Sequence, residues 1–150
     1  MSHIRQQLRE AFAAQVTGLT TTGARVFQSR IRNLAAADLP ALRIYTDQET
    51  VEDGSILDVP WEQRRTILLR CEAVAKAAAN LDDTLDLMCK EVEVAIAANS
   101  TLGGLALLHC SLASTEIQMD GNSEVPAGMA TMSWKIEAFT MSNAPDVPAQ

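Results

Sequence analysis

The stretch of sequence that decides the fold is residues 64–77, Arg64-Arg65-Thr66-Ile67-Leu68-Leu69-Arg70-Cys71-Glu72-Ala73-Val74-Ala75-Lys76-Ala77. Apolar side chains recur there at every second position, from Ile67 to Ala75, whereas the positions of the other face are mostly polar, Thr66, Arg70, Glu72 and Lys76, with Leu68 and Val74 among them. Because side chains on a strand point alternately to its two faces, this pattern predicts a long, half-buried strand. The small residues near its end favour close packing of a helix across the apolar face.

The residues that follow have the period of a helix instead. Over residues 81–98, one face gathers the apolar side chains of Leu81, Leu85, Met88, Val92, Ala95 and Ile96, as in an amphipathic helix. Asn80 is the expected N-cap. Asp82 and Asp83 would lie in the first turn, where carboxylates interact favourably with the helix dipole.

Other elements are expected on both sides of this pair. Residues 2–17 predict a helix, because an apolar residue recurs every fourth position. Residues 41–46 predict a strand, and residues 25–30 either a short strand or an ordered loop. Two further strands, over residues 105–119 and 130–138, should pair antiparallel, because Asp120-Gly121-Asn122-Ser123 between them has the composition of a hairpin turn.

These elements predict an α+β fold: a mostly antiparallel sheet of about four strands, with two helices packed on one face. Residues 1–142 should form a single domain. Residues 47–60, rich in acidic side chains, are expected to be a long mobile loop. Residues 143–150, with Pro145 and Pro148, are expected to be a disordered tail.

The composition narrows the class of protein. Of the 150 residues, 47% are hydrophobic and 21% charged, as in a globular domain. No stretch reaches the ~18 uninterrupted apolar residues of a membrane span, and the first residues do not resemble a secretory signal. The domain is therefore expected to fold in a cytoplasm, and its cysteines, Cys71, Cys89 and Cys110, to be reduced core residues.

The charge is acidic and unevenly placed. The formal net charge is −7, which disfavours binding to a phosphate backbone. Residues 1–46 carry six basic and two acidic side chains, a net +4, whereas residues 47–62 carry six acidic and no basic ones, a net −6. Such asymmetry is typical of a solvated surface, and it would also suit head-to-tail assembly of identical subunits.

The spacing of the candidate residues predicts no catalytic, metal or cofactor site. His3 and His109 do not lie at ligand spacing from another His or Cys. On the expected strand, His109 and Cys110 would point to opposite faces. Gly103-Gly104 follows a helix and precedes a strand, the reverse of a phosphate-binding loop. The chain is expected not to be an enzyme.

Three segments together resemble a known family. They are Thr22-Gly23-Ala24-Arg25-Val26-Phe27-Gln28-Ser29-Arg30, Leu39-Pro40-Ala41-Leu42-Arg43-Ile44-Tyr45-Thr46 and Glu91-Val92-Glu93. In order and element lengths, residues 4–140 resemble the phage minor tail protein U family, the tail terminators of lambda-like siphophages. No catalytic motif is part of the resemblance.

The resemblance implies a structural role in the virion tail, after assembly in the host cytoplasm. Members form a hexameric ring that caps the tail tube, stops its polymerisation and offers a surface to the head–tail connector. The implied partners are other copies of the chain, the tail tube protein and the connector protein. DNA would pass through the ring without specific binding.

Two alternatives stay open: a ring protein of the phage neck or head-completion joint, and a small ligand-binding or enzymatic domain with no phage role. Arginines near aromatic residues could also stack on single-stranded nucleic acid, although the acidic net charge argues against this. The residues expected at subunit or tube contacts are Arg25, Phe27, Arg30, Arg32, Asp47, Glu49, Glu52, Asp53 and Trp61.

Overall fold

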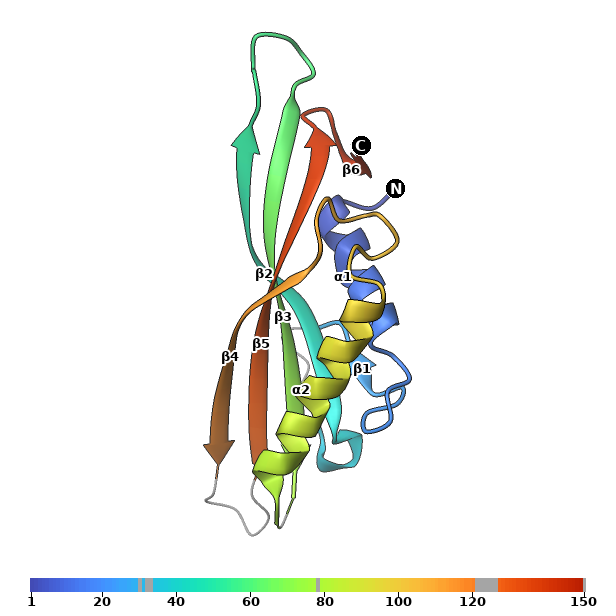
Figure 1. Cartoon of the computed structure of the whole chain (residues 1–150), viewed down its shortest axis with the longest axis vertical. Coiled ribbons are helices and arrows are strands. Elements are labelled where there is room, and N and C mark those ends of the chain that lie inside the picture. The colour runs from blue at the N-terminus through green and yellow to red at the C-terminus, as the bar shows by residue number, and fades with distance from the viewer. Residues whose placement is uncertain (30, 32–33, 78, 121–126, 150) are drawn as a thin grey trace.

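The alternating segment forms β3 (Glu62–Lys76), the central strand of a long twisted sheet in a computed structural model of the chain (Figure 1). The structure describes residues 1–29, 31, 34–77, 79–120 and 127–149. Over these residues the elements, in chain order, are α1 (Ile4–Gln15), β1 (Val26–Phe27), a short 3-10 turn (Ala36–Asp38), β2 (Ala41–Asp53), β3, α2 (Leu81–Ala98), β4 (Ser111–Asp120), β5 (Ala127–Met141) and β6 (Ala144–Pro148).

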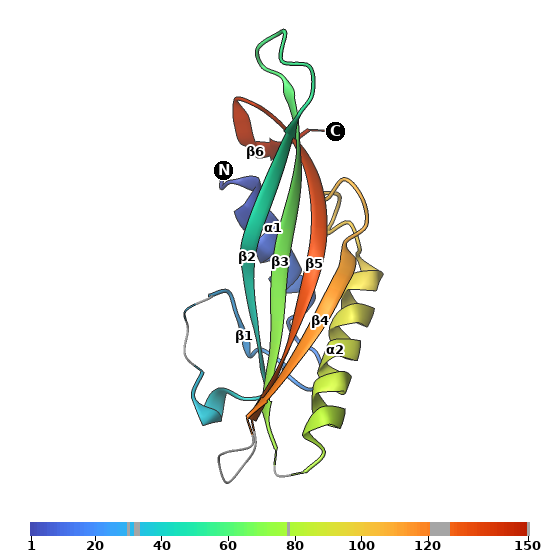
Figure 2. The ribbon, with the colours of Figure 1, turned by 90° about the vertical axis from the view of Figure 1, so that its left-hand side faces the viewer.

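The sheet has the strand order β1-β2-β3-β5-β4, and β6 pairs with β5 beyond the end of β4. The β2–β3, β3–β5, β4–β5 and β5–β6 pairs are antiparallel, whereas β1 runs parallel to β2. Both helices lie on one face of the sheet, with α1 and α2 beside different halves of its length (Figures 1 and 2). Over the other face, none of the described residues forms a helix (Figures 1 and 2).

The core lies between this face of the sheet and the two helices. Ile67, Leu69 and Cys71 of β3 are fully buried there. Phe12 of α1 packs edge-on against Trp134 of β5, with ring centroids 5.6 Å apart. α2 contributes a buried stripe at helical spacing: Leu85, Met88, Val92 and Ile96. The apolar face predicted from the strand period and the one predicted from the helix period therefore pack together in one core.

The expected fold class is wrong in its sheet. The sheet has six strands and is mixed, not about four strands in a mostly antiparallel arrangement. β1 is only two residues long, too short for a strand period to show in the sequence. β6 carries the prolines that suggested a disordered tail, but it lies at a sheet edge, where a missing N–H costs little.

Two further segments differ from the secondary structure expected for them. Residues 47–53 continue β2 where a mobile loop was expected. Residues 105–110 precede β4 and form turns: the amide of Leu107 donates to the carbonyl of Glu137, and that of Cys110 to Ser100. A compact loop is possible here because Gly103 and Gly104 have φ angles of +71° and +89°.

The two helices are capped differently at their N-terminal ends. Asn80 is the N-cap residue of α2, as expected, but it takes a left-handed conformation and its side chain makes no capping hydrogen bond. The N-cap of α1 is His3, whose Nδ1 accepts a hydrogen bond from the amide of Arg5 at 3.1 Å. The antiparallel β4–β5 pairing is confirmed, while residues 121–123 of the expected turn lie outside the described residues.

Candidate assembly interface

The β2–β3 hairpin projects past both helices as an arm at one end of the molecule (Figures 1 and 2). We call residues 47–53 and 61–66 the stem of the arm and residues 54–60 its tip. The tip exposes three aliphatic side chains: Leu57 is 90% exposed, Val59 79% and Ile56 62%. Single exposed apolar residues are ordinary, but a cluster on a projecting element is typical of an interaction site.

A charged cluster anchors the stem to the body. Glu49 of β2 accepts hydrogen bonds from Arg5 of α1 at 2.8 Å and from Arg65 of β3 at 3.0 Å. Arg65 is itself buried, and its Nε donates to Thr140 of β5 at 2.8 Å. One carboxylate therefore joins the first helix to two strands of the stem.

A second cluster closes the stem just below the tip. Asp53 accepts hydrogen bonds from Trp61 Nε1 at 2.7 Å and from Gln63 at 3.0 Å, and these bonds lower the pKa of its carboxyl. The amide of Gly54 donates to the carbonyl of Glu62 at 2.8 Å. The apolar tip is thus carried on a stem whose geometry is fixed by hydrogen bonds.

The helix-free face of the sheet carries ion pairs between neighbouring strands. Arg70 donates to Asp47 at 3.1 Å and to Ser133 at 2.7 Å. Arg64 pairs with Glu137, and this hydrogen bond lowers the pKa of the Glu137 carboxyl. Asp47 of β2 and Glu137 of β5 are therefore each paired with a β3 arginine of the same chain.

The structure gathers five of the expected contact residues on the arm: Asp47, Glu49, Glu52, Asp53 and Trp61. Arg25 and Phe27 lie away from the arm, at β1. Arg25 donates to the carbonyls of Pro40 at 2.7 Å and Thr21 at 2.9 Å, so it holds the segment before β1 against the start of β2. Arg30 and Arg32 lie outside the described residues.

The apolar residues of the tip were not among the contact residues expected from the sequence. Ile56, Leu57 and Val59 were included in a segment, residues 47–60, that was judged polar from its acidic groups. The available signal was three aliphatic residues within four positions, between Gly54 and Pro60. In a solvated loop those positions have no reason to be apolar.

Side chains that could take part in catalysis are held by contacts within the fold. Ser100 Oγ and His109 Nδ1 lie 2.5 Å apart on the surface, a pairing that the sequence did not predict. Within the described part of the chain, no carboxylate hydrogen-bonds to His109, so the third member of a catalytic triad is not present there. No group of three or more potential metal ligands is found among the same residues.

The cysteines are free. Cys71 and Cys110 are buried as expected, and Cys89 is half-buried. Burial raises the pKa of Cys71, and it raises those of Cys89 and Cys110 to about 11. A thiol with a raised pKa is a poor nucleophile at neutral pH.

Neither described helix has the length and apolar character needed to cross a membrane. No family model matches the sequence, and no curated protein matches it. Among solved structures, the chain is similar to one in the "Virion of native gene transfer agent (GTA) particle". The two are 14% identical, with a TM-score of 0.34, over 90% of this chain and 92% of that chain.

Proposed function

We propose that this chain is a structural subunit of a phage-type virion, and that it forms a ring that closes the tail tube as a tail terminator. The observation that carries the assembly role is the arm, with its exposed aliphatic tip on a hydrogen-bonded stem. The terminator role rests on the resemblance of residues 4–140 to the tail protein U family.

The arm suits assembly because its stem is fixed before contact. Arg5, Glu49 and Arg65 tie the stem to the body, so the stem loses little conformational entropy when the tip binds. Burying three aliphatic side chains would favour association by roughly 1.5 kcal/mol or more each. Apolar contacts of this kind require no substrate and no cofactor.

Stopping a polymer requires two unlike surfaces. One must fit the last ring of tube subunits, and the other must reject further tube subunits while accepting the connector. The arm lies at one end of the long axis and the β4–β5 end at the other (Figure 1), so the molecule offers unlike surfaces in opposite directions. The net charge of −7 would let DNA slide through such a ring without adhering.

The test is end capping of purified tail tubes, assembled from the tube protein encoded in the same genome. A terminator binds tube ends and stops their elongation, which electron microscopy with labelled protein detects. Binding to the isolated connector ring without binding to tubes would instead assign the chain to the neck. Binding to neither would contradict the proposal.

A further inference from the structure

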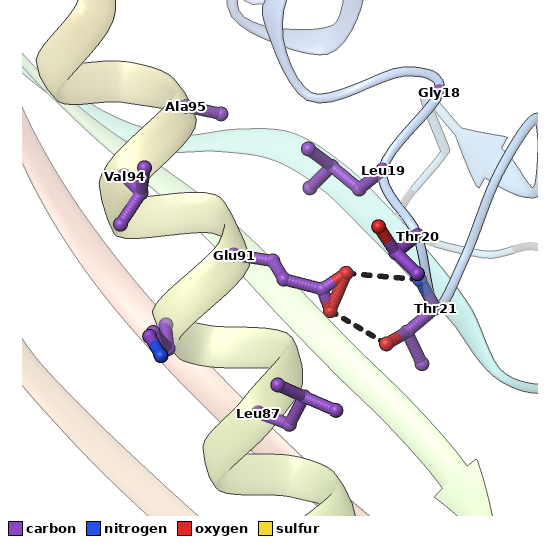
Figure 3. Close-up of a pocket in the computed structure, with 9 residues that line it drawn as sticks. Gly18, Leu19, Thr20, Thr21, Leu87, Glu91, Val94 and Ala95 are labelled. Carbon is purple, nitrogen blue, oxygen red and sulfur yellow. Dashed lines mark hydrogen bonds between the residues drawn. The ribbon is translucent and has the colours of Figure 1, made fainter.

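The second apolar feature of the surface is a groove beside α2, with a volume of about 450 Å³. One wall is the turn of residues 18–21, and the other is the outward face of α2 (Figure 3). The side chains that line it include Leu19, Leu87, Val94 and Lys90. Leu87 is 49% exposed and Val94 62%, so α2 has an apolar stripe on the side away from the core.

Hydrogen bonds hold the two walls of the groove together. Glu91 of α2 accepts hydrogen bonds from the amide of Thr21 at 2.9 Å and from its hydroxyl at 2.5 Å (Figure 3). The turn itself is closed by the amide of Gly23, which donates to the carbonyl of Leu19 at 2.7 Å. Because Glu91 is held by the turn, Lys90 is the charged group of the lining that is available to a ligand.

The tip of the arm matches this groove in chemistry. Ile56, Leu57 and Val59 supply exposed aliphatic side chains, and Asp58 between them is an exposed carboxylate. Lys90 supplies the opposite charge, and among the described residues neither Asp58 nor Lys90 has an ion-pair partner. A volume of about 450 Å³ lies within the ~300–1,000 Å³ of typical small-ligand sites, so it can receive aliphatic side chains.

The tip cannot fill the groove of its own molecule. It lies beyond the helices at one end of the long axis, whereas α2 lies beside the other half of the sheet (Figures 1 and 2). The stem is fixed to the body by Glu49 and Arg65. Only another molecule can therefore bring a tip to this groove.

The open edges of the sheet are less suited to joining two copies. β4 carries Glu116 and Asp120 and no basic residue, and β2 carries Glu52 and Asp53 in addition to Asp47 and Glu49, which are paired with arginines. Pairing these two edges would bring like charges together. Pairing tip with groove brings aliphatic side chains together and places Asp58 near Lys90.

We infer that the tip of the arm docks in the α2 groove of a second copy of this chain. Ile56, Leu57 and Val59 contact Leu19, Leu87 and Val94, and Asp58 pairs with Lys90. The two surfaces are different, so the contact is heterologous: each copy keeps a free tip or a free groove until a ring closes. This deepens the proposed function and rests on it for the ring, since it names the two surfaces through which copies of the chain would join.

The test measures self-association by sedimentation velocity over a wide concentration range. Leu57→Glu disables the tip and Val94→Glu the groove, and each should weaken association about thirtyfold or more. An equimolar mixture of the two variants should give a dimer and nothing larger, because one intact tip meets one intact groove. Ile117→Glu, at an exposed apolar site on β4, is the matched control and should associate like the wild type.

A charge exchange tests the pairing itself. Asp58→Lys and Lys90→Glu should each weaken association roughly tenfold, because each replaces an attraction with a repulsion. The double variant should recover wild-type association. A monomeric wild type at every concentration, full association of the tip and groove variants, or loss of association only in Ile117→Glu would overturn the inference. Tube capping can succeed or fail independently of all these results.

Discussion

At the scale of single residues, Glu49 is the side chain on which the arm most depends. It is reached by Arg5 from α1 and by Arg65 from β3, and its side chain is only 11% exposed. Arg65 is 7% exposed, so its charge needs a nearby carboxylate to compensate for lost hydration. Removing the Glu49 charge leaves a buried guanidinium without its anion.

We therefore expect Glu49→Gln to destabilise the fold by about 2–3 kcal/mol, toward the lower end for a buried pair because Arg5 is partly exposed. Urea unfolding at neutral pH measures this. Glu52→Gln is the control: Glu52 lies on the same strand but is exposed, and its change should stay within about 0.5 kcal/mol. Equal effects from the two variants would show that the Glu49 cluster does not anchor the stem.

Three acidic residues show what could not be predicted from the sequence. Asp47, Glu49 and Asp53 were singled out as contact residues, which stays a prediction. Their partners within the chain are Arg70, Arg65 and Gln63, and these were not predicted. A run of acidic residues in a sequence indicates local negative charge, but it does not identify the side chains that pair with it. The pairing became visible only in the structure, where the β2–β3 pairing brings these side chains within hydrogen-bond distance.

At the scale of elements, the most periodic segments were predicted best. α2 has the expected bounds, because Leu85, Met88, Val92 and Ile96 mark a buried face. β3 likewise shows its buried face in the sequence. The second half of β2 shows no such face, because residues 50–53 are exposed on both sides. A strand without a buried face leaves no alternating pattern, and it was taken for a loop.

The tip should contribute to assembly and not to folding. Replacing Ile56, Leu57 and Val59 together with serine should leave the thermal midpoint within about 2 °C of the wild type, because these side chains are exposed. Leu85→Ala, in the fully buried stripe of α2, should lower stability by about 2–5 kcal/mol. Thermal unfolding compares the two. A large loss in the serine variant would mean that the tip packs on the body.

At the scale of the whole molecule, the fold places the tip of the arm and the α2 groove apart. The arm reaches beyond the helices, and the groove lies on the outward side of α2 (Figures 1 and 3). Unlike surfaces on one chain generate head-to-tail contacts, which end in closed rings or in open filaments according to the rotation between copies. The two helices and the hydrogen-bonded stem would hold that rotation constant, so one type of assembly is expected, and the proposed ring requires that this rotation close.

The most direct test of this assembly is light scattering after size-exclusion chromatography, with electron microscopy of each peak. The wild type should gain mass with concentration until it reaches a single closed species with a central hole. The serine variant of the tip should stay monomeric under the same conditions. A wild type that is monomeric at every concentration, or a serine variant that forms the same closed species, would contradict assembly through the arm.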